Sequence, residues 1–159
     1  MILYHGSNVI VKDPQIIEGE KSRDFGVAFY LTPVKEHAEK WAIRKAKQER
    51  EGKPYVSVFE WNEDINNLKF IDFKDADMKW LDIVVKCRSD IKFKHGYDIV
   101  KGKIADDSVG ETILYVVTGV MRKQDAIKKL KFQEINSQVA FCSKPSLKTL
   151  KYIKHYEVK

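Results

Sequence analysis

The chain has 159 residues, and its 29 Lys and Arg exceed its 23 Asp and Glu to leave a formal net charge of +6. Its hydrophobic share of 43% and its length indicate one globular domain with a real core, which we expect to span residues 1–159. No apolar run approaches the roughly 20 residues that cross a bilayer, and the first residues do not resemble a signal peptide, so we expect a cytoplasmic protein without membrane contact.

The positive charge is spread along the chain and favours an acidic partner only weakly. It exceeds the negative charge mainly over residues 123–131 and 144–159. Solvated helix faces explain these runs better than a nucleic-acid surface, because charge alone produces attraction and not recognition.

Hydrophobic patterning in the first half of the chain predicts short strands around one long helix. Residues 8–24 are polar and long for a connection, as binding loops often are. Residues 34–51 have helical periodicity, ended by Gly52-Lys53-Pro54. The apolar face of this helix contains Val34, Ala38, Trp41, Ala42 and Ala46. The predicted strands cover residues 2–4, 27–32, 55–61 and 68–72.

The second half of the chain is predicted to mix helices and strands without regular alternation. A helix over residues 75–88 directs Met78, Leu81, Val84 and Val85 inward, and a strand follows at 97–100. Residues 107–117 fit a helix or a strand, and a helix is favoured. A helix at 125–130, a strand pair at 132–135 and 138–142, and a last helix from Ser143 to about Ile153 complete the chain. This order indicates the α+β class.

Two segments near the N-terminus have the composition of a ligand site. Residues 3–7 read Leu-Tyr-His-Gly-Ser, which predicts a turn that brings together an imidazole, a hydroxyl and a glycine able to approach a ligand closely. Residues 25–32 read Phe-Gly-Val-Ala-Phe-Tyr-Leu-Thr and add an aromatic strand. Each segment alone also fits an ordinary structural role, a satisfied turn or a core strand.

Together these segments resemble the NAD-binding half of the ADP-ribosyltransferase superfamily, in the branch of the poly(ADP-ribose) polymerases and diphtheria toxin. Over nearly the whole chain, including residues 97–107 and 136–141, the sequence is similar to the bacterial family called domain of unknown function 3990. The resemblance implies an ADP-ribosyltransferase-like split β-sandwich, in which two small sheets are flanked by helices and NAD lies between the sheets.

The resemblance implies a role for each residue of the first segment. His5 would bond the adenosine ribose and position the dinucleotide, while Ser7 and the backbone of Gly6 would bond the nicotinamide amide. The residues themselves also allow a turn in which His5 only satisfies local backbone groups.

The second segment and the following helix are implied to hold the rest of NAD. Tyr30 would lie against the nicotinamide ring, with Gly26 and Thr32 in the same motif. Trp41, eleven positions later, would be the second aromatic of a sandwich, although core packing also explains it. Arg23 is placed to donate paired hydrogen bonds from its guanidinium to a diphosphate, or it is an ordinary loop arginine.

The third element implied by the resemblance is a catalytic glutamate on a late strand, and here its place is taken by Gln138. His5, Tyr30 and Gln138 are therefore the predicted catalytic residues. A Gln amide can bond a ribose hydroxyl, but it carries no negative charge to stabilise a developing cation and cannot act as a base. Carboxylates at 106–107 or Glu134 could supply that charge, or they are solvated surface acids.

The predicted function is that of an NAD-dependent mono-ADP-ribosyltransferase with NAD as co-substrate. Its acceptor would be a macromolecule, either protein or nucleic acid, and the family likeness makes a toxin with a small antitoxin partner plausible. The alternatives are a non-catalytic NAD or ADP-ribose binding module and an NAD glycohydrolase that uses water. No metal site is predicted, because neither Cys87, Cys142 nor the histidines have metal-ligand spacing, and the two cysteines are expected to be reduced.

Overall fold

The structure is a computed structural model that describes residues 1–18, 23–103, 107–131 and 137–159. Within these residues it is a mixed α+β protein with two small sheets and five helices. The helices are α1 (Lys35–Glu49), α2 (Met78–Ser89), α3 (Asp107–Val117), α4 (Lys123–Leu130) and α5 (Lys144–Leu147). The strands are β1 (Ile2–Ser7), β2 (Phe29–Leu31), β3 (Tyr55–Trp61), β4 (Phe70–Asp72), β5 (Ile99–Lys103), β6 (Ser137–Phe141) and β7 (Leu150–Glu157).

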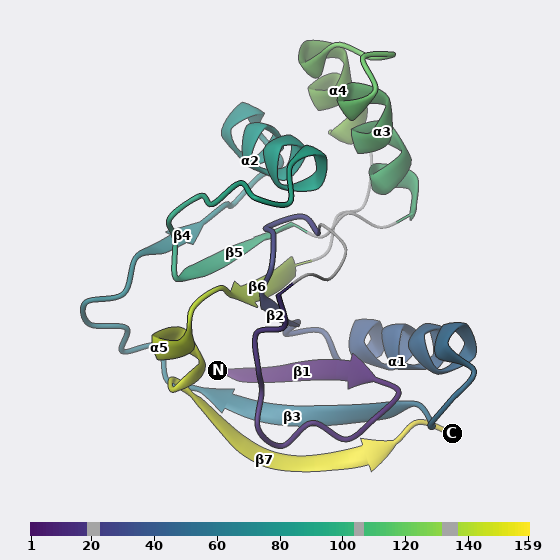
Figure 1. Cartoon of the computed structure of the whole chain (residues 1–159), viewed down its shortest axis with the longest axis vertical. Coiled ribbons are helices and arrows are strands. Elements are labelled where there is room, and N and C mark those ends of the chain that lie inside the picture. The colour runs from purple at the N-terminus through teal and green to yellow at the C-terminus, as the bar shows by residue number, and fades with distance from the viewer. Residues whose placement is uncertain (19–22, 104–106, 132–136) are drawn as a thin grey trace.

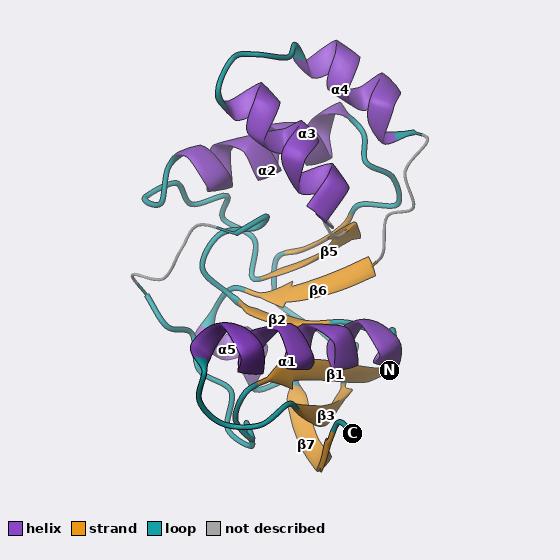
Figure 2. Ribbon diagram, turned by 90° about the vertical axis from the view of Figure 1, so that its right-hand side faces the viewer, coloured by secondary structure: helices purple, strands orange, loops and turns teal. Residues whose placement is uncertain are grey.

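The two sheets have the strand orders β1-β3-β7 and β2-β6-β5-β4, and all pairs are antiparallel except β4 with β5. The smaller sheet lies beside α1, and α2, α3 and α4 gather beyond the larger sheet (Figures 1 and 2). These layers agree with the expected arrangement of two small sheets with flanking helices.

Three apolar clusters join the layers. One lies between the sheets and combines residues of both, such as Leu3 and Phe59 with Phe29 and Phe141. A second joins the opposite face of the larger sheet to α2, α3 and α4, and a third joins the smaller sheet to α1. Each sheet is therefore apolar on both faces, which explains why its strands do not show a simple apolar-polar alternation.

Strand β1 extends further than expected and takes in the predicted His-Gly-Ser turn. His5, Gly6 and Ser7 pair with Ser57, Val56 and Tyr55 of β3, so the expectation of a turn here is wrong. Nonlocal pairing with β3 supplies backbone partners that the local sequence does not reveal.

The alternation of β1 decides what each of its side chains meets. Leu3 packs between the sheets, whereas Tyr4 packs with the cluster under α1. A Cβ on Gly6 would overlap the carbonyl oxygen of Ala38 and lie 2.9 Å from the Ala42 nitrogen. The glycine therefore allows α1 to lie against β1, and its missing side chain faces the helix.

The predicted C-terminal helix is mostly a strand. Helix α5 begins after Ser143, whose side chain accepts from the Ser146 nitrogen, but it ends at Leu147. Residues Leu150–Glu157 then pair with β3 as β7. This segment pairs with the free edge of β3, because nonlocal hydrogen bonds outweigh its weak local preference for a helix.

The strand at residues 55–61 and the helix at residues 107–117 are found with the predicted ends, and the other predicted elements are found with shifted ends. Met78, which was predicted to point inward, is exposed, and Trp41 on the apolar face of α1 is 40% exposed. The predicted strand at 132–135 lies outside the described residues. Strand β6, its expected partner, has β2 and β5 as neighbours.

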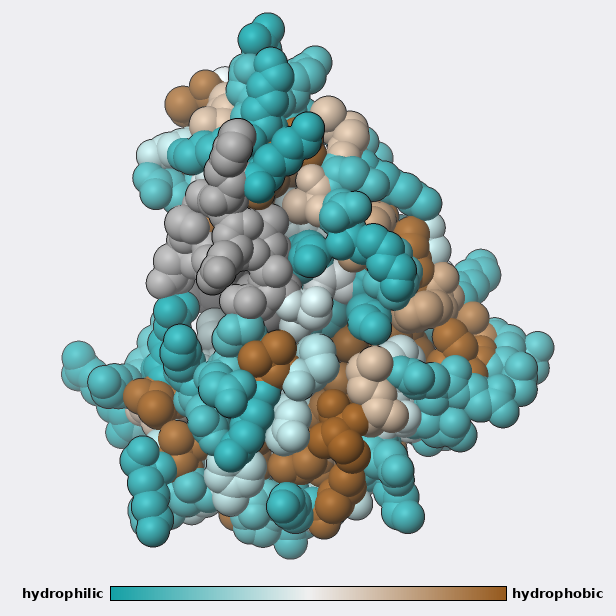
Figure 3. Space-filling view, turned by 180° about the vertical axis from the view of Figure 1, so that it is seen from behind, coloured by the Kyte–Doolittle hydropathy of each residue, from teal (hydrophilic) through white to brown (hydrophobic). Residues whose placement is uncertain are grey.

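In the described part of the chain, no helix combines enough length and apolar character to cross a bilayer. On the face shown in Figure 3, apolar residues form separate patches among hydrophilic ones.

Candidate functional site

A pocket of about 1030 Å³ lies where β1 and β2 separate. The two strands meet at a bridge between Tyr4 and Thr32, and beyond it the pocket is walled by the C-terminal half of β1, residues of the 8–17 loop and one side of α1. All the predicted site residues except Gly26 line this pocket. Segments far apart in sequence thus meet around one cavity, in the size range of small-molecule sites.

His5 is held in one orientation at the pocket wall. Its Nδ1 lies 2.8 Å from the backbone oxygen of Tyr30, and its ring packs 4.3 Å from the ring of Phe29. A carbonyl only accepts, so Nδ1 carries the hydrogen and Nε2 keeps its lone pair. Burial lowers the pKa of His5 from 6.5 to about 4, with smaller contributions from nearby Arg23 and Lys45, so the ring is neutral at pH 7.

This neutral His5 makes folding stability dependent on pH. The unfolded chain binds the His5 proton near pH 6.5 but the folded protein binds it only near pH 4, so unfolding free energy falls as pH drops through this window. Between pH 7 and pH 4, we expect the wild type to lose unfolding free energy on the order of 2 kcal/mol through His5. His5→Asn should lack this loss, and its side-chain nitrogen can still donate to Tyr30. Urea unfolding of both proteins at pH 7, 5.5 and 4 measures the difference. If the unfolding free energies of the two proteins changed with pH in parallel, the lowered pKa assigned to His5 would be contradicted.

Gly6 and Ser7 present mainly backbone to the pocket. Tyr4 exchanges two backbone hydrogen bonds of 2.9 Å with Thr32, on the edge of β1 opposite β3. Because strand geometry repeats every two residues, the N–H and C=O of Gly6 point to this same edge, where β2 has diverged. The Ser7 hydroxyl accepts from the nitrogen of Val9 at 3.4 Å and holds the start of the loop. The arrangement offers one donor and one acceptor to a planar amide.

Tyr30 fastens the next loop by its hydroxyl, which donates to Gly26 at 2.6 Å and accepts from the nitrogen of Phe25 at 3.1 Å. Burial raises the pKa of Tyr30 well above 10, and the charge of Asp24 adds to this effect. Tyr30 is therefore poorly suited to proton transfer, and its ring is the part that lines the pocket. Gly26 has φ of +78° and serves the turn that this hydroxyl closes.

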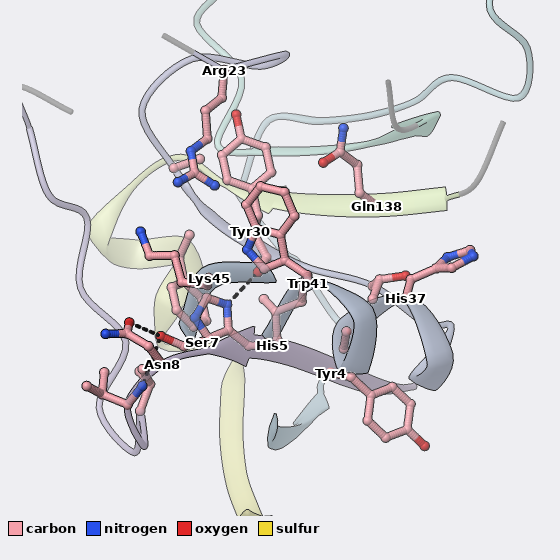
Figure 4. Close-up of a pocket in the computed structure, with 18 of the residues that line it drawn as sticks. Tyr4, His5, Ser7, Asn8, Arg23, Tyr30, His37, Trp41, Lys45 and Gln138 are labelled. Atoms are coloured by element: carbon pink, nitrogen blue, oxygen red, sulfur yellow. Dashed lines mark hydrogen bonds between the residues drawn. The ribbon is translucent and has the colours of Figure 1, made fainter. Parts of the chain in front are cut away.

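A planar cation lies against both predicted aromatic residues. The guanidinium carbon of Arg23 is 5.7 Å from the ring centroid of Tyr30 and 5.7 Å from that of Trp41. Figure 4 shows Arg23 reaching from its loop toward these rings. In this structure Arg23 thus makes cation–π contacts in the space predicted for nicotinamide.

Thr32 lines the pocket with its hydroxyl already engaged. Its Oγ1 donates to the Ser137 oxygen at 2.9 Å and accepts from the nitrogen of Val34 at 3.1 Å. These bonds tie β2 to β6 and to the start of α1. The observed role of Thr32 is structural, and its predicted contact with a ligand stays a prediction.

Gln138 is 5% exposed, and its side chain belongs to a polar network that sequence analysis missed. Its Nε2 donates to Asp24 Oδ2 at 3.1 Å, and Arg88 Nε donates to Asp24 Oδ1 at 2.7 Å. Asp24, Arg88 and Gln138 all line the pocket. The three residues are up to 114 positions apart, so no local spacing could have linked them.

Basic residues of α1 were also missed. Among the described residues, six Lys and Arg side chains line the pocket against two acidic ones. They are Lys12, Arg23, Lys40, Arg44, Lys45 and Arg88, with Asp13 and Asp24. A helical spacing of four brings Lys40 and Arg44 to one side of α1, a signal that the sequence contained. The pocket is therefore suited to an anionic ligand.

The structure does not describe the side chains of the carboxylates that were considered as replacements for a glutamate. Asp106 and Glu134 lie outside the described residues, and only the backbone of Asp107, at the start of α3, is described. No group of three or more His, Cys, Asp or Glu side chains among residues 1–18, 23–103, 107–131 and 137–159 could hold a metal ion. Among the described residues, Asp24 is an acid in direct contact with the predicted third position, at 3.1 Å from Gln138 Nε2.

Fold and site together define a mixed α+β protein with a cationic pocket between two small sheets. A model of the family DUF3990, described as a protein of unknown function, matches residues 1–152. The chain belongs to this family. No curated protein and no solved structure matches the chain.

Proposed function

We propose that this protein binds NAD in the pocket and transfers ADP-ribose to a macromolecular acceptor, either protein or nucleic acid. The observation that carries the proposal is the slot beside Tyr30 and Trp41, where the guanidinium of Arg23 lies 5.7 Å from both ring centroids. Nicotinamide in NAD is likewise a flat cation, because its ring nitrogen is quaternary. A slot that holds one planar cation against two aromatic rings is chemically suited to another.

The rest of the pocket offers complementary groups for the other parts of NAD. The lone pair on His5 Nε2 accepts a ribose hydroxyl, and the strand edge at Gly6 pairs with a carboxamide. Arg44 and Lys45 on α1, with a displaced Arg23, offset the two negative charges of the diphosphate. The surplus of cations around the cavity therefore supports a dinucleotide over a neutral ligand.

In the proposed reaction the bond between ribose C1′ and the nicotinamide nitrogen breaks. Nicotinamide leaves as a neutral molecule with the bonding electrons, and positive charge develops on the ribose. An acceptor oxygen or nitrogen then bonds C1′ and loses a proton. The protein would orient the nicotinamide ring through Tyr30 and Trp41 and hold the ribose through Gln138. The contacts at the ribose are the ones that strengthen as positive charge shifts to the sugar.

NAD labelled in the adenosine part distinguishes this function from its alternatives. After incubation with purified protein and a cell lysate, label in protein or nucleic acid together with free nicotinamide supports transfer. Nicotinamide with free ADP-ribose alone indicates hydrolysis by water. Binding without nicotinamide release indicates a binding module. The observation that supports this alternative is that position 138 is a glutamine and not a glutamate. A folded protein with no NAD binding would refute the proposal.

Trp41 provides an optical test of the nicotinamide slot. It is 40% exposed, whereas Trp61 and Trp80 are buried in apolar clusters. We expect nicotinamide to quench tryptophan fluorescence and Trp41→Phe to remove most of that change, because only Trp41 lines the pocket among the tryptophans. Trp61 and Trp80 remain as internal controls. An undiminished signal in Trp41→Phe would place the ligand elsewhere.

A further inference from the structure

Asp24 is a buried carboxylate that accepts hydrogen bonds from both Arg88 and Gln138. It is 6% exposed; its Oδ1 accepts from both Nε and Nη2 of Arg88, and its Oδ2 accepts from Gln138 Nε2 at 3.1 Å. The bonds to Arg88, at the end of α2, fix the carboxylate in one orientation. One oxygen is thereby directed at the side chain that replaces the expected glutamate.

The amide of Gln138 is fixed in turn. Its Nε2 has a second acceptor in the backbone oxygen of Lys103 at 3.3 Å. Both acceptors lack a hydrogen to donate, so the amide nitrogen must face them and Oε1 must face away. Figure 4 shows the Gln138 oxygen on the side of Tyr30, toward the pocket. A hydrogen-bond acceptor is thus presented to the pocket, with a negative charge directly behind it.

We propose that Asp24 is a positioning residue that acts through Gln138, and that the pair replaces a single catalytic glutamate. Gln138 Oε1 accepts the ribose hydroxyl, and Asp24 holds the amide in place and supplies the negative charge. This inference rests on the proposed function, because it concerns the same reaction. In this mechanism Gln138 bonds the sugar and Asp24 stabilises its positive charge.

Three physical effects support the assignment. A hydrogen bond from the amide nitrogen to a carboxylate polarises the amide and makes its oxygen a stronger acceptor. The site is buried, so the charge of Asp24 is poorly screened by water. Its field already reaches the pocket, because Asp24 contributes to the raised pKa of Tyr30. Arg88 offsets part of this charge, so the effect should be smaller than that of a direct carboxylate contact.

The simplest expectation is that a glutamate restored at position 138 raises activity. The network of Asp24 and Gln138 predicts the opposite. In Gln138→Glu the new carboxylate would replace an amide that lies 3.1 Å from Asp24. Two carboxylates this close cannot both ionise easily, so one retains a proton near neutral pH. Gln138→Glu alone should therefore not raise activity at pH 7. Exchanging the two groups, in Asp24→Asn with Gln138→Glu, keeps one charge and one amide and places the charge next to the sugar.

Nicotinamide release from NAD by four proteins tests the proposal: wild type, Asp24→Asn, Gln138→Glu and the double exchange. We expect Asp24→Asn to lower kcat about tenfold or more while KM for NAD changes less than about twofold, because the lost interaction acts mainly in the transition state. Gln138→Glu should be less active than wild type at pH 7 and should show an altered acid limb in its pH profile. The double exchange should recover kcat to within about threefold of wild type.

Thermal melting of each protein separates these effects from simple loss of structure. Should Asp24→Asn fail to fold, the double exchange still decides, because it keeps the number of charges in the network. A folded double exchange with near wild-type kcat supports the proposal, and one that is no better than Gln138→Glu overturns it. Wild-type kcat in a folded Asp24→Asn also overturns it, while the proposed function stands. A wild type that releases no nicotinamide refutes both.

Discussion

Gly6→Ala is expected to destabilise the protein by about 3 kcal/mol, the largest single effect on stability that we expect here. The added Cβ would overlap the backbone oxygen of Ala38 and lie 2.9 Å from the Ala42 nitrogen. Both are atoms of α1, which cannot rotate away as a flexible side chain would. The helix must move off β1, which opens the buried cluster beneath it. Urea unfolding followed by circular dichroism measures the loss.

Gly110→Ala is the matched control for this change. In α3 its nearest neighbour would be Arg88 Nη1 at 3.8 Å, an ordinary contact, so alanine should stabilise the helix by about 0.5–1 kcal/mol. The same substitution is thus expected to have opposite signs at the two glycines. Because α1 carries Trp41, Gly6→Ala should also weaken nicotinamide binding where the protein is still folded. An unchanged unfolding midpoint for Gly6→Ala would mean that α1 does not pack on β1 as described.

His5→Asn is expected to lower the affinity for NAD about 5- to 150-fold, which corresponds to about 1–3 kcal/mol for one lost hydrogen bond and an unpaired ribose hydroxyl. The substitution keeps a donor for the Tyr30 carbonyl, which His5 Nδ1 contacts at 2.8 Å, but removes the acceptor at Nε2. Free nicotinamide has no ribose, so its affinity should be unchanged. Calorimetric titration with NAD, ADP-ribose and nicotinamide measures all three.

The ligand series identifies which part of NAD meets His5. Equal losses for NAD and ADP-ribose with unchanged nicotinamide binding support the ribose contact. A loss for nicotinamide as well would indicate that the substitution disturbs the slot. Affinity for NAD that is unchanged in a folded His5→Asn would refute the assignment of Nε2. Because the His5 pKa is about 4, the wild-type affinity should also stay constant from pH 8 to pH 5.5, since the acceptor lone pair is present throughout.

The segments that sequence analysis located well are those whose pattern is local. The helix at residues 34–51 and the strand at residues 55–61 were found because their apolar spacing repeats within a few positions. The role of Trp41 was harder to predict. It shares a helix side with Ala38 and Ala42, but the small alanines pack against β1 while the large ring stays 40% exposed at the pocket.

The candidate site was predictable as a set of residues and not as a network. His5, Tyr30, Trp41 and Gln138 were chosen from motifs, and the structure brings all four to one pocket. Asp24 was not chosen as a site residue, because an aspartate next to an arginine in a polar loop has by itself the pattern of a solvated surface acid. Its importance comes from contacts with residues 64 and 114 positions away.

By itself, the sequence determined the α+β class, most of the helices and strands, and the motif residues of the pocket, because these depend on side-chain periodicity and residue type over short distances. Tertiary structure decided that residues 5–7 are strand and not turn, that Leu150–Glu157 pairs with β3, and that Asp24 lies behind Gln138. The physical reason is the same in each case. A strand edge, or a carboxylate, can bond many partners, and only packing of the whole chain selects one.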